Sequence, residues 1–348
     1  MGRTRVTLAD VAAASGVSVT TASLVLTGRA RELRISEAAE RRVRSTAREL
    51  GYRRGALVPG PRPGRSRTIG FVLDTLASSA PAGDVVRGAL EAAHLRGSVL
   101  FVGETRGDPV EERALFEAMC DRRADGIVLA ATHPRPVALP DGLRDVPVVL
   151  LNATASRPGV PSVMSDERQG GRSAARVLVE AGHVRGVHLI GVGPCDDPPG
   201  GVAAVERLAG MREVFGATGV QVAGAHRCPE WTPQEGYDAT RRLLGTHLPR
   251  ALVCFDDRLA FGACQALSEA GLSVPGDVSV LGFGDHPVAS WMRPRLTTVA
   301  VPHHELGAEA VRILVEIVER RPRGVRAPLV HRVPMPLCDG GSVAPPRR

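Results

Sequence analysis

The stretch TLADVAAASGVSVTTASLVLT, residues 7–27, predicts two short helices joined by a tight turn. Thr7 is placed to cap the first helix, and Asp10 is placed to complete a capping box with it. Gly16 lies where the turn favours a left-handed residue, and Ser18 is placed to cap the second helix. This spacing is typical of a helix-turn-helix unit. Apolar residues recur at helical spacing in both segments: Leu8, Val11 and Ala12, then Ala22, Val25 and Leu26.

A third helix is expected after this unit, with Ser36 as its N-cap and Gly51 as its terminator. Acidic residues in its first turn suit the positive end of the helix dipole. Three short helices with a basic outer face fit a small DNA-reading head. One face of the third helix carries Ala39, Val43, Ala47 and Leu50, and the other carries Arg41, Arg42, Arg44 and Arg48.

The positive charge of the chain is concentrated around these helices. The 44 cationic residues are all arginine, and 37 acidic residues leave a net charge of 44 − 37 = +7. Residues 1–68 hold 14 Arg against 5 acids, or +9, whereas residues 69–348 hold 30 Arg against 32 acids, or −2. This distribution indicates that the basic N-terminal segment binds a polyanion, and nucleic acid is the leading candidate. The alternative is a solvated basic face that reflects an arginine-rich composition.

Length and composition exclude several classes of protein. At roughly 150 residues per domain, 348 residues correspond to two or three domains. With 43% hydrophobic and 23% charged residues, and no apolar run approaching about 18 residues, the sequence argues against a membrane span and against disorder. The N-terminus lacks the apolar core of a signal peptide, and the six cysteines show no metal-ligand spacing. We therefore expect a cytoplasmic protein with reduced thiols and no metal or other cofactor.

From Thr68 onward, apolar strand-like runs alternate with helical patterns. Nearly continuous apolar strands joined by helices predict parallel sheets covered on both faces, and two successive series predict two lobes. Ligands in such folds bind at the carboxyl ends of the strands. The first series is TIGFVL (68–73), SVLFVG (98–103), GIVLAA (126–131) and PVVLLN (147–152), and the second is GVHLIGVG (186–193), VQVAGAHR (220–227), ALVCFD (251–256) and VSVLGFG (278–284).

Polar residues stand at the expected ends of these strands or in nearby segments. Carboxylates and an amide accept hydrogen bonds from hydroxyl groups, an arginine donates a fork, and an aromatic face packs against a ring. The set suits a polyhydroxylated ligand, although the tryptophan has the alternative of a local packing role. The candidates are Asp74, Asn152, Asp256, Asp257 and Asp285 at strand ends, Arg207 at the opening of the helical segment RLAGM, and Trp231 in the loop before EGYDATRRLL.

A series of ordered segments along the chain matches a known family. The segments are VTLADVAAASGVSVTTASLVL (6–26), ELGYRRGAL (49–57), GRSRTIGFV (64–72), RRADGIVL (122–129), VPVVLLN (146–152), ERLAGM (206–211), EWTPQEGYDATRRLL (230–244), CFDDRLAFGACQAL (254–267), VPGDVSVLGFGDHPVA (274–289) and PRLTTV (294–299). In order and spacing they resemble the LacI/GalR family of bacterial transcriptional regulators. The resemblance implies an α/β fold: a three-helix helix-turn-helix head and a two-lobed, periplasmic-binding-protein-like body with parallel sheets.

The resemblance also implies a domain plan and a set of partners. Residues 1–52 would form the DNA-binding domain, 53–68 a hinge linker, 69–340 the effector-binding and dimerisation domain, and 341–348 a C-terminal tail. The implied protein is a homodimeric repressor of double-stranded operator DNA, with no membrane association and no enzymatic activity. A small carbohydrate-like effector between the lobes would change its affinity for DNA.

Carried onto this sequence, the family pattern implies a set of DNA contacts. Val19, Thr20 and Leu24 occupy positions that face base edges, and the short hydroxyl side chains suit phosphate oxygens. Many relatives have Arg in place of Leu24, which could contact only an apolar group such as a thymine methyl. The complete implied set is Thr7, Ser18, Val19, Thr20, Thr21, Ser23, Leu24, Thr27 and Leu57.

The linker RRGALVPGPRPGRSRT, residues 53–68, departs from its relatives. In the family a hinge helix forms on DNA and a leucine wedges into the minor groove, but Pro61 stands at that position here. Because prolines remove donors and favour extended neighbours, we expect at most one helical turn, ending near Val58, and reduced wedging and bending. We expect phosphate contacts from the linker arginines Arg53, Arg54, Arg62, Arg65 and Arg67. The alternative is a flexible basic linker in which these arginines make no fixed contacts.

For the effector site, the resemblance places Arg207, Trp231, Asp256 and Asp285 on or beside contact positions. Departures at Gly284, Val301 and TLASSAPAG (75–83) leave a sugar, a nucleoside or another small polar metabolite open. Rival readings are an enzyme, a transport-type solute-binding protein and a DNA-binding protein without an effector response. The segment GVGPC (191–195) lacks the third glycine of a dinucleotide site, and the sequence has no P-loop or G-x-S-x-G motif.

Overall fold

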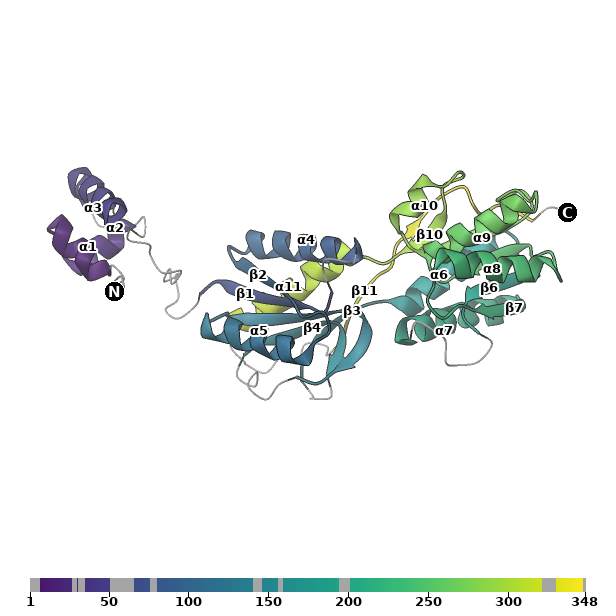
Figure 1. Cartoon of the computed structure of the whole chain (residues 1–348), viewed down its shortest axis with the longest axis horizontal. Coiled ribbons are helices and arrows are strands. Elements are labelled where there is room, and N and C mark those ends of the chain that lie inside the picture. Colours follow the sequence, from purple (N-terminus) through teal and green to yellow (C-terminus); the bar gives the residue numbers. More distant parts are fainter. Residues whose placement is uncertain are drawn as a thin grey trace. The chain divides into compact units, whose positions relative to one another are not determined.

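The computed structural model describes most of the 348 residues. The described ranges are 7–26, 30, 35–50, 66–75, 80–139, 146–155, 159–193, 201–320 and 330–346. The chain divides into two compact units, Met1–Thr68 and Ile69–Arg348, which we call the head and the body (Figure 1). Within the described ranges, no single helix has both the length and the apolar character needed to cross a membrane.

The head contains the expected helices α1 (Leu8–Ser15), α2 (Val19–Leu26) and α3 (Glu37–Glu49). The predicted capping box is confirmed, because the Thr7 hydroxyl accepts from the Asp10 amide and the Asp10 carboxylate accepts from the Thr7 amide. Gly16 adopts φ 63° and ψ 38°. The chain turns by 104° between α1 and α2, as in helix-turn-helix units.

A small apolar core holds the three helices of the head together. The inward faces predicted for α1 and α2 are confirmed, but Leu50 follows α3 as its C-cap and is 39% exposed, so placing it on the inward face was wrong. Two arginines of the outer face of α3 tie the helices together: Arg42 donates to the Ser15 carbonyl and Arg44 to the Val25 carbonyl. The core consists of Val11, Ala12, Ala22, Val25, Ala30, Val43 and Ala47.

The body contains the two sheets that the apolar runs predict, each of six strands. The first has the order β11-β5-β4-β3-β1-β2 and the second β12-β10-β9-β8-β6-β7. The pairs β1–β3, β3–β4, β4–β5, β5–β11, β6–β7, β6–β8, β8–β9 and β9–β10 are parallel, and the pair β10–β12 is antiparallel. The strands are β1 (Thr68–Leu73), β2 (Val99–Glu104), β3 (Gly126–Val137), β4 (Val148–Ala155), β5 (Ser162–Ser165), β6 (Val187–Gly191), β7 (Val222–Arg227), β8 (Ala251–Cys254), β9 (Ser279–Gly284), β10 (Thr297–Ala300), β11 (Val330–Val333) and β12 (Leu337–Cys338).

Helices cover both faces of each sheet. On the first sheet, α4 and α11 pack on one face and α5 on the other. On the second sheet, α6 and α7 pack on one face and α8 and α9 on the other. Successive residues of one strand, such as Leu189 and Ile190 of β6, therefore belong to different cores. The helices are α4 (Ala80–Leu95), α5 (Pro109–Asp121), α6 (Glu167–Glu180), α7 (Gly201–Thr218), α8 (Pro233–Leu244), α9 (Asp257–Glu269), α10 (Pro287–Trp291) and α11 (His303–Arg320).

The edge strands differ from the expectation of full burial. Strands β2 and β7 each lie at the end of a sheet, and their residues are exposed or half-buried. Their apolar sequences resemble those of central strands, but an edge strand has a neighbour on one side only. The expectation that all strands are covered on both faces was therefore wrong for these two.

The chain passes between the two sheets three times, after β5, after β10 and after β11 (Figure 1). Hydrogen bonds join these passages: the Gln169 side chain accepts from the Met335 amide, and the Asp166 amide donates to the Val333 carbonyl. The segment after residue 340, expected as a tail, is bonded to the second sheet through Ser342 and Ala344. The body therefore extends beyond residue 340.

Candidate DNA-binding and ligand-binding sites

The N-terminal end of α2 presents the side chains predicted to face base edges. Val19 is 49% exposed and Thr20 is exposed, so both are accessible to a groove. Leu24, one turn later, is half-buried, as are Thr21 and Ser23. The geometry is that of a helix whose first turn is free to enter a major groove.

The hydroxyls at the helix starts are used in caps. Ser18 Oγ accepts from the Thr21 amide at 3.0 Å and lies 2.8 Å from Thr21 Oγ1, so Ser18 caps α2 as expected. Thr7 Oγ1 donates to Asp10 Oδ2 at 2.7 Å. These bonds cap α1 and α2, and a phosphate contact by the same residues stays a prediction.

Several predicted DNA contacts lie outside the described residues. Thr27, Leu57 and the linker through residue 65 belong to this group, which includes the expectation about Pro61 and the terminating role of Gly51. Of the linker arginines, Arg67 is described, with φ 56° and an exposed side chain just before β1.

A pocket lies at the carboxyl end of β1 and beside the middle of β3 and β4. It encloses about 330 Å³ of space including its open mouth, and the first turns of α4 and α11 complete its wall. The wall is largely apolar, with a few polar groups, as in most small-molecule sites. The lining residues are Leu73, Thr75, Pro81, Ala82, Val85, Ala130, Ala131, Thr132, Leu151, Asn152 and His303.

Asn152 contributes an unpaired acceptor to this pocket. It was expected after its strand, but β4 continues to Ala155, and Asn152 lies within it at φ 51°. The neighbouring ladder shifts register between Ala130 and Arg135, so the strand pair is irregular at this depth. The side chain is 8% exposed, and its Oδ1 has no hydrogen-bond partner in the described structure. A buried acceptor without a donor favours a ligand that supplies one.

Asp74 lies beside the pocket and is satisfied by protein donors. Its carboxylate accepts from the backbone amide of Thr132 at 2.9 Å and from the Thr132 hydroxyl. Arg135 Nη2 lies 3.6 Å from Asp74 Oδ2. Asp74 therefore orients Thr132, which lines the pocket.

Arg207 is the centre of a second cluster, on the other sheet. It was expected to open a helix, but α7 begins at Gly201, so Arg207 lies inside the helix and is 5% exposed. Its Nε donates to Glu167 Oε2 at 2.5 Å and its Nη1 to the Phe255 carbonyl at 2.6 Å. Sequence reasoning did not identify Glu167, because the two residues are 40 positions apart on different helices.

Aromatic rings surround the Arg207 guanidinium. Its central carbon lies 4.6 Å from the centre of the Phe283 ring and 5.9 Å from that of Trp231. Trp231 adopts φ 53° in the loop before α8, and its indole Nε1 donates to the Gly191 carbonyl at 2.9 Å. The structure thus brings together two of the predicted ligand contacts, Arg207 and Trp231.

The two remaining predicted carboxylates have protein partners. Asp256 caps α9 by accepting from the Arg258 amide, and it also accepts from the Arg258 guanidinium at 2.9 Å. Asp285, at φ 54° directly after β9, lies 4.0 Å from Arg295. Both stand at the carboxyl ends of strands as expected, and ligand contact by either stays a prediction.

Asp257 is a buried acid at the same sheet end. Its side chain accepts from Thr298 Oγ1 at 2.7 Å and from the His286 amide at 2.8 Å. Burial raises the pKa of its carboxyl to about 7, although these two hydrogen bonds lower it. Its position after a buried strand was visible in the sequence, but its complete burial was not.

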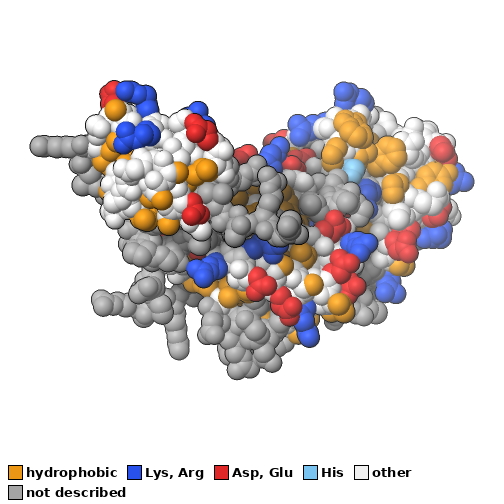
Figure 2. Space-filling model, turned by 60° about the vertical axis from the view of Figure 1, so that its left-hand side comes forward, with side chains coloured by type: hydrophobic (Ala, Val, Ile, Leu, Met, Phe, Trp, Pro, Cys, Tyr) orange, Lys and Arg blue, Asp and Glu red, His pale blue; other side chains and the backbone are white. Residues whose placement is uncertain are grey.

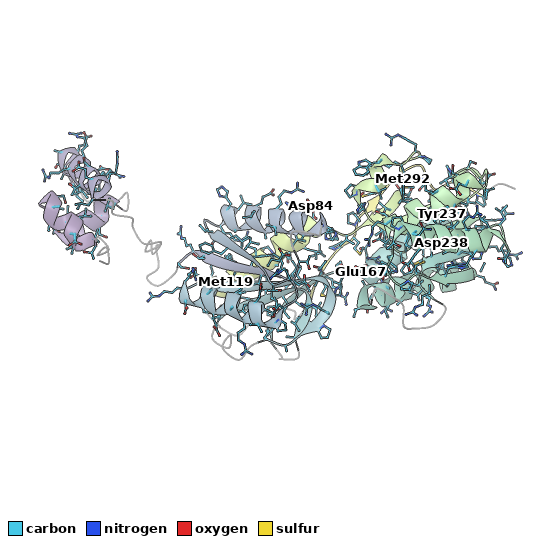
Figure 3. All side chains as sticks on the ribbon, in the orientation of Figure 1. Asp84, Met119, Glu167, Tyr237, Asp238 and Met292 are labelled. Carbon is cyan, nitrogen blue, oxygen red and sulfur yellow. The ribbon has the colours of Figure 1, made fainter. Side chains whose placement is uncertain are left out.

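Glu167 and His303 link the two clusters within the body. Glu167 lies where the chain leaves β5 for the second sheet (Figure 3). His303 begins α11, where the chain returns to the first sheet. Burial lowers the pKa of His303, while the nearby carboxylates of Asp84 and Glu167 raise it. Helix α7 also contacts β3. The pocket and the Arg207 cluster are therefore neighbours.

A three-helix head and a two-sheet body with three chain passages define a class: regulators built on a periplasmic-binding-protein-like body. Residues 7–55 match the family model described as bacterial regulatory proteins of the lacI family. Residues 175–343 match the periplasmic binding protein-like domain. The ribose operon repressor of Escherichia coli K12 is 30% identical over 313 residues, which cover 89% of this chain and 92% of that protein. The chain belongs to the LacI family of bacterial regulatory proteins.

Other relatives agree with this assignment. The transcriptional repressor PurR of Klebsiella pneumoniae is 29% identical over 323 residues, covering 90% of this chain and 91% of that protein. A solved complex of the transcriptional regulator CelR with cellobiose has a TM-score of 0.62 at 29% identity, over 97% of this chain and 100% of that one. The lac repressor dimer bound to operator shares the fold, with a TM-score of 0.74 at 23% identity over 98% of this chain and 100% of that one.

Proposed function

We propose that this protein is a transcriptional repressor that binds operator DNA as a homodimer and whose affinity for DNA is changed by a small polar ligand. The observation that carries the proposal is a capped helix-turn-helix with an accessible first turn of α2, on a chain whose body holds a pocket with an unpaired buried acceptor. Relatives named as repressors of the ribose operon and as PurR support the DNA-binding role. Neighbouring structures with bound cellobiose or ribose support the ligand.

In this proposal Val19, Thr20 and Leu24 read base edges, and the hydroxyl side chains around them fix the register on phosphates. The first turn of α2 is exposed at Val19 and Thr20, which supports the assignment. The remaining contacts proposed are Thr7, Ser18, Thr21, Ser23, Thr27 and Leu57, with residues 1–52 as the DNA-binding domain and 53–68 as the linker.

The ligand is proposed to bind where the pocket meets the Arg207 cluster. Asn152 Oδ1 would accept from a ligand hydroxyl, and Arg207 and Trp231 would supply donors and an aromatic face. Asp74 would act by holding Thr132, and Asp256 and Asp285 would act at the strand ends of the second sheet. Binding would couple to DNA affinity reciprocally, by a coupling free energy of about 1–3 kcal/mol.

The homodimer is supported by apolar side chains on an edge of the body. Leu95 at the end of α4 is 82% exposed, and Val99 and Phe101 of the edge strand β2 are 59% and 47% exposed. Figure 2 shows orange apolar areas among charged side chains on the face that it presents. An edge strand with exposed apolar residues invites pairing with another chain. A second copy would bury this edge and place two heads on one operator.

We further propose that the protein acts by binding and not by catalysis, and that it acts in the cytoplasm, where its DNA lies. The relatives support the proposal because they are named as repressors.

Selection of bound sequences from a random DNA pool, followed by anisotropy titration of the selected operator, tests the DNA-binding role. We expect a pseudo-palindromic consensus, and we expect T20A to reduce the preference for specific operator over random DNA more than the affinity for random DNA. A pool that yields no consensus, or a T20A protein with unchanged preference, would contradict the role.

A further inference from the structure

The Glu167–Arg207 pair gives the ligand site an unusual charge balance. Both side chains are 7% exposed, and Nε of Arg207 donates to Glu167 Oε2 at 2.5 Å. The other carboxylate oxygen of Glu167 accepts from Ser165 Oγ at 2.8 Å, at the chain passage after β5. Because opposite charges at this distance cancel in their surroundings, the arginine presents hydrogen-bond donors without a net positive charge.

The unused donors of Arg207 remain available to a ligand. Nε is used by Glu167 and Nη1 by the Phe255 carbonyl, and within the described part of the chain Nη2 donates no hydrogen bond. The guanidinium is fixed against Phe283 at 4.6 Å, so it cannot turn freely to meet a ligand anion end-on. A ligand would therefore contact the N–H groups of a fixed Arg207 guanidinium, whose positive charge is already balanced by Glu167.

The described lining of the neighbouring pocket carries no fixed positive charge. Among the described residues, this lining includes no acidic side chain and no arginine, and its one ionisable group is His303. Burial lowers the pKa of His303, which favours its neutral form near pH 7. Asn152 lines this pocket, and its Oδ1, which carries partial negative charge, is buried without a donor. An anion placed here would face this oxygen and, beyond His303, the Glu167 carboxylate.

We propose that Glu167 makes the ligand site selective for neutral polyhydroxylated ligands, by cancelling the charge of Arg207. A carboxylate-bearing analogue of the same ligand is rejected, because a buried anion without a net cationic partner costs free energy that a hydroxyl does not. This inference rests on the proposed function, since it concerns the same site, but its test does not require DNA.

The test uses matched pairs of neutral and acidic probes: D-glucose with D-gluconate, and D-ribose with D-ribonate. Calorimetric titration and thermal shift are measured on the full-length protein, on E167Q and on E213Q. Glu213 is a matched control because it also joins α6 to α7 through arginines, Arg168 and Arg172, but on the surface. The glutamine of E167Q can still accept from Arg207, which limits the loss of stability.

We expect the wild type to bind a neutral probe at least about tenfold more tightly than its acid partner, and E167Q to gain at least about tenfold in affinity for the acid, with E213Q unchanged. An acid that binds the wild type as tightly as its neutral partner would overturn the proposal. So would an E167Q protein that binds acids no better than E213Q does. If the wild type binds no probe, the titration of E167Q with the acidic probes tests the proposal. Saturable binding of an acidic probe to E167Q supports it, and no such binding overturns it.

Two further measurements separate this outcome from other failures. The melting temperature of E167Q without probe shows whether the variant folds, and the comparison of probe pairs on the wild type does not depend on the variant. Operator binding without probe is measured on the same samples. A wild-type protein that does not bind operator would count against the proposed function. The probe titrations would still test the charge selectivity of the ligand site, because they do not involve DNA.

Discussion

Replacing Asp257 by Asn should remove a pH dependence from the stability of the body. Asp257 is fully buried at the start of α9, and burial raises the pKa of its carboxyl from 3.8 to about 7, against the hydrogen bonds from Thr298 and His286 that lower it. At pH values between 3.8 and about 7, the Asp257 carboxyl of the folded protein holds a proton that the same group has released in the unfolded chain. By linkage, the free energy of unfolding must then fall as the pH rises.

The size of the effect follows from the pKa difference. The stabilising contribution is fully present below pH 3.8, where both states are protonated, and is lost as the pH rises through about 7. At ~1.4 kcal/mol per pKa unit, a difference of about three units corresponds to on the order of 4 kcal/mol. Asn at this position does not ionise, and it can accept from the His286 amide while donating to Thr298 Oγ1.

Urea unfolding of the wild type and D257N, at pH values from roughly 4 to 8, measures this difference. We expect the wild type to lose on the order of 4 kcal/mol relative to D257N across this range. D238N is the control, because Asp238 is a half-buried surface residue of α8 bonded to Gln234 (Figure 3). Parallel pH profiles for the wild type and D257N would show that the pKa of Asp257 is not raised in the folded protein.

Three further changes have defined outcomes. L24R should create a preference for guanine at one operator position of about 1–3 kcal/mol, because arginine can fork onto its O6 and N7; sequence selection measures it, and an unchanged consensus would argue against this contact. F101E should convert the dimer to a monomer in sedimentation, since it charges the exposed edge strand, whereas V110E on α5 should not; a dimeric F101E protein would exclude this edge as the interface. T7A should cost about 1 kcal/mol in the protection of α1 amides from hydrogen exchange, because it removes the capping box; full protection of α1 would show that the cap contributes little.

Local signals in the sequence predicted the elements of the fold well. The capping box of Thr7 and Asp10 and the turn at Gly16 depend on residues within a few positions of one another, and the structure confirms them. The apolar runs also predicted the central strands, because burial on both faces demands continuous apolar sequence. The same signal failed for β2 and β7, since sheet order is set by long-range pairing that composition does not encode.

The candidate site was predictable in part. The strand ends located Asp74, Asp256 and Asp285 correctly, because parallel strands bring their carboxyl ends to one edge. Asn152 lies inside β4 because the strand continues beyond an irregular ladder, which no local pattern reveals. The partnership of Arg207 with Glu167 arises from the packing of α6 on α7, and so only the folded chain shows it.

In the proposed function, ligand binding and operator binding are coupled through the body. The most direct test of this coupling is titration of fluorescent operator with the wild type and R207Q at fixed salt, with and without a ligand found by thermal shift. Salt is held constant because phosphate contacts make the affinity strongly salt-dependent. We expect the ligand to change the operator affinity of the wild type by about 5- to 150-fold and to leave the operator affinity of R207Q unchanged. Equal affinity with and without a bound ligand, in the wild type, would contradict the coupling.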